Sequence, residues 1–166
     1  MKKKCLLTLF VLIFLSCSSY AQKGYRGNIE FGSCFLIGDY PYPPFYSNDT
    51  FVYYNLSTTH GYQFNSHIFV GAGVEFMGWG SAYGLESCPL FADAKINILS
   101  GKWKPFIDCR AGIDLQNGCG FYANPSIGIQ FSFTEKLGLY LKAGYVNSII
   151  EEERFNSINL KLGFEF

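Results

Sequence analysis

The segment Ser157-Ile-Asn-Leu-Lys-Leu-Gly-Phe-Glu-Phe166 alternates strictly between apolar and polar positions. Its even-numbered residues, from Ile158 to Phe166, are all apolar, whereas its odd-numbered residues are polar, charged or glycine. Successive side chains of a β-strand point to opposite faces, so the pattern predicts a strand with one apolar and one polar face. Soluble sheets and membrane barrels both contain such strands, and the rest of the chain has to distinguish them.

The same alternation recurs along the chain. Seven earlier segments show it, at about residues 25–37, 51–64, 67–78, 88–99, 105–115, 119–133 and 137–146. The connections at residues 65–66, 100–102, 116–118 and 134–136 are short, whereas those at 38–50, 79–87 and 147–156 are longer. Short turns at one end and mostly longer loops at the other are typical of outer-membrane barrels. We therefore expect eight antiparallel strands.

Ionisable side chains fall on the polar parity of nearly every strand. They are Arg26, Glu30, Glu75, Asp93, Lys95, Asp108, Arg110, Asp114, Lys142, Lys161 and Glu165, and none lies on the apolar parity. The same parity is rich in glycine, which suits a cramped interior better than a solvated surface. In a soluble lipocalin-like barrel this face would meet water, and in a transmembrane barrel it would point inward. We predict the second arrangement: an all-β, eight-stranded, antiparallel up-and-down transmembrane β-barrel.

The lumen of an eight-stranded barrel is just filled by side chains. We therefore expect the eleven ionisable residues to form a paired, hydrogen-bonded plug, because isolated charges there would be costly. The alternative is that they form a proton or ion path.

The chain is also 19% aromatic, with aromatic residues near many strand ends. Two interfacial girdles are expected from Phe51, Tyr53, Tyr54, Phe64, Trp79, Trp103, Phe106, Phe133, Tyr145 and Phe166.

The N-terminus has the layout of a secretory signal peptide. Three lysines precede an apolar run from Leu6 to Leu15 and a small-residue region. We predict a signal peptide at residues 1–21, cleaved between Ala21 and Gln22, and a barrel domain at residues 22–166. Lipoprotein processing at Cys17 is an alternative.

Without residues 1–21 the chain keeps ten basic against 13 acidic residues, which argues against nucleic acid as a partner.

Several short motifs resemble the small outer-membrane β-barrel domain proteins of Gram-negative bacteria. They are Gly61-Tyr-Gln-Phe64, Phe69-Val-Gly-Ala-Gly-Val-Glu75, Pro105-Phe-Ile-Asp108 with Ala111-Gly112, and Gly163-Phe-Glu-Phe166. The resemblance implies a location in the cell outer membrane and contact with its lipid. It also implies that Phe164 and Phe166 form the signal that the outer-membrane assembly machinery reads. We expect a monomer, and no surface ligand can be named.

The sequence favours a non-enzymatic role in envelope structure or surface interaction. Some barrels of this size edit lipids with a serine, a histidine and an acid, which makes a lipid-modifying enzyme the main alternative. The available histidines are His60 and His67, and His60 lies near no acidic residue on its face. The segment Tyr40-Pro-Tyr-Pro-Pro-Phe-Tyr46 is either an aromatic recognition loop or a stiff loop against the barrel rim.

Four cysteines lie beyond the predicted signal peptide. They contain no CxxC pair, so we expect no zinc site, and we expect no cofactor. Cys88 and Cys119 are both predicted at loop-side strand ends and could form a disulfide. Cys34 is expected to face the lumen and Cys109 the lipid, so those two should not pair with each other.

Overall fold

The computed structural model describes residues 24–37, 52–78, 85–115, 120–150 and 153–166. The strands in these ranges are β1 (Tyr25–Leu36), β2 (Val52–Gln63), β3 (Ile68–Gly78), β4 (Leu85–Ser87), β5 (Pro89–Asn97), β6 (Trp103–Asp114), β7 (Gly120–Ser132), β8 (Gly138–Ile150) and β9 (Glu153–Glu165). The predicted signal peptide, the Tyr40–Tyr46 segment and Cys119 lie outside these ranges and stay predictions. No helix in the described part is long and apolar enough to span a membrane.

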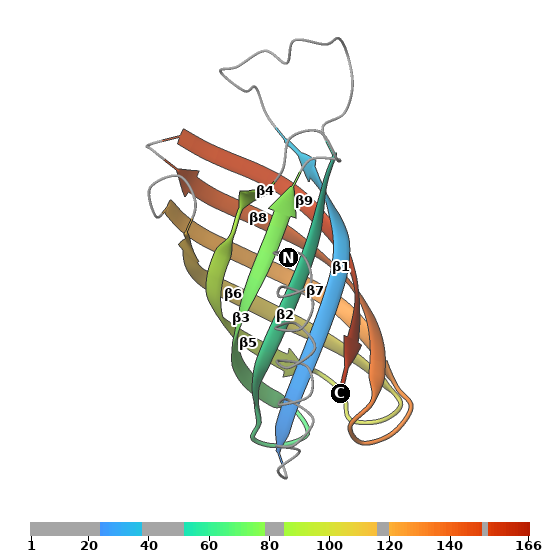
Figure 1. Ribbon diagram of the computed structural model, residues 1–166. Coiled ribbons are helices and arrows are strands. Elements are labelled where there is room, and N and C mark those ends of the chain that lie inside the picture. Colours follow the sequence, from blue (N-terminus) through green and yellow to red (C-terminus); the bar gives the residue numbers. More distant parts are fainter. Residues whose placement is uncertain (1–23, 38–51, 79–84, 116–119, 151–152) are drawn as a thin grey trace, which may run out of the picture.

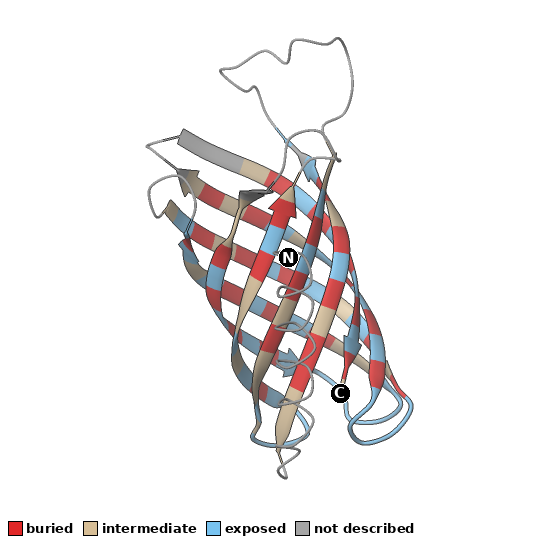
Figure 2. Ribbon diagram, in the orientation of Figure 1, coloured by how far each residue is buried: buried red, intermediate tan, exposed pale blue. Residues whose placement is uncertain are grey.

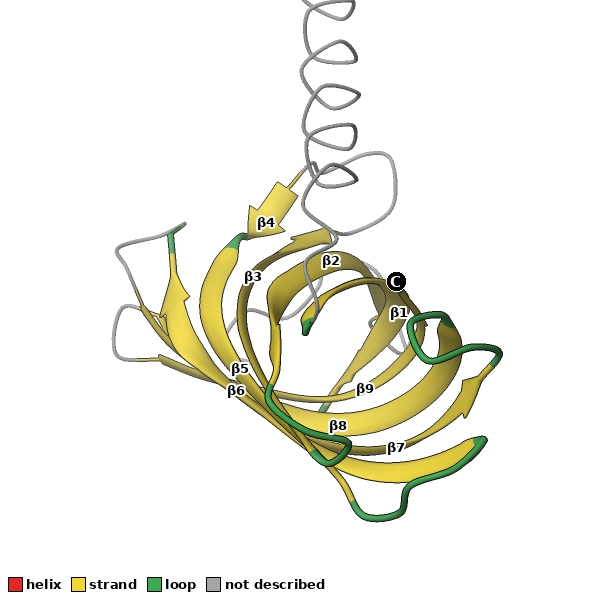
Figure 3. Ribbon diagram, turned by 90° about the horizontal axis from the view of Figure 1, so that it is seen from below, coloured by secondary structure: helices red, strands yellow, loops and turns green. Residues whose placement is uncertain are grey.

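The strands form one closed antiparallel sheet (Figures 1 and 3). Chain neighbours pair with each other except β4 and β5, which both pair with β3. The pairing of β1 with β9 completes the ring. β4 and β5 are two parts of one strand of the ring, because Met77 pairs with Ser87 in the same register in which Val74 pairs with Leu90. A bulge between Met77 and Gly78 accompanies the interruption. The chain is thus a barrel of eight antiparallel strands, as predicted.

Burial is inverted relative to a soluble protein. Along β5 and much of the other strands, buried and exposed residues alternate one by one (Figure 2). The exposed positions carry large apolar side chains, such as Ile127 at 67% and Leu162 at 57% exposure. The buried positions carry charged ones, such as Glu75 at 0% and Arg110 at 1%. A surface of this kind belongs in lipid, since apolar atoms facing water would cost free energy over the whole wall.

Two strands extend further than the sequence pattern indicates. The expected loop at residues 147–156 contains the end of β8 and the start of β9, which pair up to Ile150 and Glu153. The run of glutamates and the polar residues around it predict a loop over the whole of 147–156. A strand of about 9–11 residues is enough to cross a membrane, and β8 and β9 each have 13. Both strands therefore continue beyond the bilayer at the loop end, where polar residues are tolerated. In the same way, β4 lies within the expected loop at residues 79–87.

Glycines on the lumen side let large side chains lie against the barrel wall. A Cβ atom on Gly163 would collide with the ring of Tyr140, and one on Gly128 would collide with the ring of Phe106. Both rings are buried inside the barrel. The glycines of the polar parity therefore provide room for the aromatic part of the lumen filling.

Candidate functional site: a charged plug in the lumen

Seven ionisable side chains meet in the middle of the lumen and form what we call the central cluster. Its members are Glu30 on β1, Glu75 on β3, Asp93 on β5, Asp108 and Arg110 on β6, Lys142 on β8 and Lys161 on β9. All seven are buried. Every one lies on the inward parity of its strand, so the alternation of the sequence by itself directs these groups to one interior.

Glu30 is the most connected carboxylate of the central cluster. Arg110 donates to both of its oxygens, with Nη2 at 2.7 Å from Oε1 and Nη1 at 2.8 Å from Oε2. Lys142 Nζ lies 2.9 Å from Oε1, and the Tyr140 hydroxyl donates to the same oxygen at 2.6 Å. The Ser57 hydroxyl donates to Oε2 at 3.0 Å. A bidentate arginine pair is among the strongest ionic contacts in proteins, and this one joins β1 to β6 across the lumen.

Glu75 is the second anchor of the central cluster. Its Oε2 accepts hydrogen bonds from Lys161 Nζ at 2.7 Å and from the Tyr122 hydroxyl at 3.0 Å. Its Oε1 accepts one from the Asn55 side-chain amide at 2.8 Å. Both oxygens therefore have partners, which is the condition for burying a carboxylate without a large loss of stability.

The two aspartates lie on neighbouring strands beside the same cations. Asp93 Oδ2 is 3.3 Å from Arg110 Nε, and Asp108 Oδ2 is 2.5 Å from Lys142 Nζ. The Ser126 hydroxyl donates to Asp108 Oδ2 at 3.3 Å. The guanidinium of Arg110 thus connects carboxylates from both sides of the barrel, and the central cluster is one continuous network.

A smaller ionic group lies nearer the end at which β1 begins and β9 ends. Lys95 Nζ is 2.5 Å from Glu165 Oε2, and Gln130 donates to Glu165 Oε1 at 2.8 Å. The Lys95 ammonium also lies 5.3 Å from the ring centroids of both Phe106 and Tyr140. The aromatic faces add an attraction for this cation beyond its salt bridge.

Apolar side chains enclose the central cluster from both ends of the lumen. Toward the loop end lie Cys34, Met77, Phe91, Tyr122 and Val146, which pack together. Toward the terminal end lie Phe69, Phe106 and Tyr140, all buried. We did not predict these layers, although their inward parity in the sequence is visible once the strands are assigned. They correct the girdle prediction at Phe106, which is buried, and at Tyr53, which packs against the loop-end layer.

Comparisons with known proteins agree with this architecture. The sequence matches no protein-family model and no curated protein. Among solved structures, it is similar to the crystal structure of neisserial surface protein A, with a TM-score of 0.62 and 13% identity over 86% of this chain and 96% of that one. It is also matched to the N-terminal β-barrel domain of Pseudomonas aeruginosa OprF, with a TM-score of 0.48 and 15% identity over 87% and 98% of the two chains. At these identities the likeness concerns the fold.

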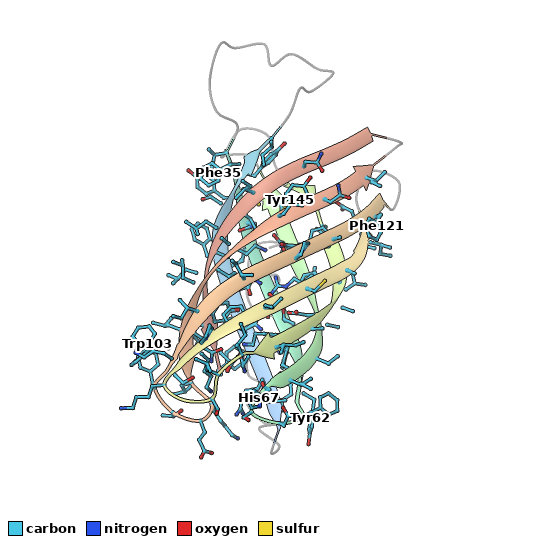
Figure 4. All side chains as sticks on the ribbon, turned by 180° about the vertical axis from the view of Figure 1, so that it is seen from behind. Phe35, Tyr62, His67, Trp103, Phe121 and Tyr145 are labelled. Carbon is cyan, nitrogen blue, oxygen red and sulfur yellow. The ribbon has the colours of Figure 1, made fainter. Side chains whose placement is uncertain are left out.

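The chain has the fold of a small outer-membrane β-barrel. The expected fold class is therefore confirmed, and the outer membrane is the location in which this fold is found. Five of the ten predicted girdle residues are exposed on the wall of the outer-membrane barrel, namely Tyr54, Phe64, Trp103, Phe133 and Tyr145. Phe51 and Trp79 lie outside the described residues. In Figure 4, Trp103 and Tyr62 lie at one end of the barrel, and Phe35, Tyr145 and Phe121 lie toward the other.

Two further predicted members of the lumen network belong neither to the central cluster nor to the Lys95–Glu165 pair. Arg26 is only partly buried and donates to the backbone oxygens of Tyr25 at 3.2 Å and Glu135 at 2.7 Å. Asp114 is buried at the loop end, where it accepts hydrogen bonds from the Ser87 hydroxyl and from the Cys88 backbone N–H. Both residues have the predicted parity, but they lie at the end of the strand, beyond the reach of the cluster.

His60 belongs to a chain of neutral hydrogen bonds on the outer wall near the chain termini. Tyr25 and His60 Nδ1 are 2.6 Å apart, and His60 Nε2 lies 3.0 Å from the Thr58 hydroxyl. The Thr58 hydroxyl donates its proton to the Asn28 carbonyl oxygen at 3.1 Å, so it can only accept from His60. Both ring nitrogens of His60 thus lie within hydrogen-bond distance of a hydroxyl oxygen. The ring of Phe166 packs edge-on against His60, with centroids 6.3 Å apart.

The cysteines have the parity that the sequence indicates. Cys34 is buried in the loop-end layer, where the Asn55 amide donates to its sulfur at 3.2 Å, and Cys109 is exposed on the wall. Cys88 lies at the loop end between β4 and β5. Its predicted pairing with Cys119 remains a prediction, because Cys119 lies outside the described residues.

Proposed function

We propose that this chain is a non-enzymatic integral outer-membrane protein with a closed lumen, which serves envelope structure or a surface interaction. The central cluster carries the proposal. Its buried charges are paired across the barrel, and apolar layers enclose them on both sides. A conducting lumen needs water or mobile charge along its length, and paired charges between buried apolar side chains favour a closed lumen instead.

The surroundings of His60 support the non-enzymatic part of the proposal. Both ring nitrogens are engaged, and the partners recorded for them among the described residues are Tyr25 and Thr58. A general base needs a free lone pair within reach of a substrate proton and is usually oriented by a carboxylate. The neutral, internally satisfied chain around His60 instead joins the first two strands near the seam with β9.

Three measurements test the proposal. Heat-modifiable gel migration in the detergent-extracted envelope fraction is expected, because a folded barrel binds less detergent than its unfolded chain. The purified barrel in planar bilayers is expected to show no stepwise conductance above that of protein-free bilayers. Reproducible conductance steps would contradict the closed lumen. Hydrolysis of phospholipid or lipid A that is lost in His60→Ala would contradict the non-enzymatic role.

A further inference from the structure

The two ends of the barrel carry opposite charge. The end with the short turns, where β1 begins and β9 ends, bears Arg26, Lys102, Lys104 and Lys136 against one exposed acidic residue of the described chain, Glu135. Glu165 is buried toward the same end and is paired with Lys95. Residues 38–51, 79–84, 116–119 and 151–152, which connect strands at the opposite end, contain four acidic residues and neither lysine nor arginine. Short turns are periplasmic in outer-membrane barrels, so we place the cationic end on the periplasmic side, level with the headgroups of the inner leaflet.

Exposed aromatic rings lie directly beside part of this cationic end. Trp103 on β6 is 61% exposed and lies 4.8 Å from the ring centroid of Phe131. Phe131 in turn lies 5.3 Å from Phe133. Figure 4 shows Trp103 projecting outward from the wall at this end. The rings form a continuous apolar edge over β6 and β7.

Two exposed lysines flank the aromatic edge. The Lys102 backbone oxygen accepts a hydrogen bond from Ser132 N at 2.8 Å, which holds Lys102 beside the end of β7. Lys136 lies in the turn that follows Phe133, a turn held by the Thr134 hydroxyl oxygen. Both lysine side chains are exposed, and no ion pair is recorded for either within the described ranges. The edge therefore offers cations immediately outside an apolar surface.

We propose that this edge is a binding site for an anionic phospholipid. Lys102 and Lys136 contact the headgroup phosphates, while Trp103 and Phe133 contact the glycerol region and the first part of the acyl chains. An amphiphile matches both halves of the site, whereas a soluble acidic partner would leave the aromatic rings unused. Tryptophan and lysine are both favoured at the membrane interface, because each has an apolar part that faces the acyl chains and a polar or charged end that reaches the headgroups. The proposal rests on the proposed function, since it requires the barrel to be inserted in a bilayer.

The test uses Trp103 as its own reporter. In the variant Trp79→Phe, Trp103 is the single tryptophan of the chain. The variant is inserted into phosphatidylcholine vesicles that contain a minor fraction of lipid brominated near the headgroup end of its chains, either phosphatidylglycerol or phosphatidylcholine. Brominated phosphatidylglycerol is expected to quench Trp103 more strongly at equal mole fraction. The preference should fall roughly fivefold for each lysine removed and should be lost in about 1 M salt.

Matched variants decide the outcome. The double variant Lys102→Gln, Lys136→Gln should remove the lipid preference, and Glu135→Gln, which removes the one acidic group of this rim, should keep or raise it. Equal quenching by the two lipids, or a preference unchanged in the double variant, overturns the inference. A barrel that does not show heat-modifiable migration in the vesicles contradicts the proposed function instead, so the two failures are distinguishable.

Discussion

The central cluster shows how seven charged side chains can be buried in one barrel. Each carboxylate lies against a cation contributed by another residue of the ring, and hydroxyl and amide donors reach further oxygens of Glu30 and Glu75. Removing one partner would leave a buried charge without compensation, which is more harmful than losing one hydrogen bond. Glu30 is the residue for which this effect should be largest, because both Arg110 and Lys142 depend on it.

The substitution Glu30→Gln is therefore expected to destabilise the barrel by about 3–5 kcal/mol. Urea unfolding in detergent micelles, followed by gel migration, measures the change. The matched control is Glu135→Gln on the exposed turn, for which a change within about 0.5 kcal/mol is expected. Equal effects of the two substitutions would mean that the Glu30 ion pairs contribute nothing to stability.

At the scale of elements, the terminal strand β9 illustrates why the register is strongly specified. Lys161 and Glu165 point inward, whereas Leu160, Leu162 and Phe164 are exposed on the wall. A slip by one residue would exchange these faces, because the side-chain period of a strand is two. Lys161 would then face lipid and lose its salt bridge to Glu75 at the same time.

A lysine placed on the outer face of β9 should show this cost directly. We expect Leu160→Lys, near the middle of the strand, to destabilise the inserted barrel by about 2–4 kcal/mol, and Phe164→Lys, near the periplasmic end, by about 0–1 kcal/mol. Unfolding by urea in lipid vesicles compares the two variants. A cost independent of position along β9 would contradict the membrane depth that the strand implies.

At the scale of the whole molecule, the distribution of charged and apolar residues is the reverse of that in a soluble barrel. Buried charged residues and exposed large apolar residues both occur on the strands around the ring. Figure 2 shows the resulting alternation of buried and exposed positions along the strands. The soluble lipocalin-like alternative requires the opposite arrangement, so the distribution of burial decides between the two. Inside the wall, the described residues of the central cluster are buried and paired with one another.

A spin label can test which medium surrounds the wall. With the other cysteines replaced, a nitroxide on Cys109, which is exposed on the wall, is expected to collide with oxygen rather than with a water-soluble nickel complex. A label at Glu135→Cys, on the exposed turn, is the control and should show the reverse accessibility. Free access of the nickel complex to the Cys109 label would mean that this face meets water, as it would in a soluble barrel.

The order of apolar and polar residues was sufficient to predict the strands, their facing and the inverted barrel. A strand has only two faces, and the choice of medium for each follows from the cost of burying or exposing charge. The sequence could not show which inward groups meet. Glu30 and Arg110 are 80 positions apart in the chain, and the barrel closure brings them together. The apolar layers that enclose the central cluster depend likewise on which residues of different strands lie at the same level along the barrel axis. The pairing register between strands sets that level, and the sequence of a single strand does not encode it.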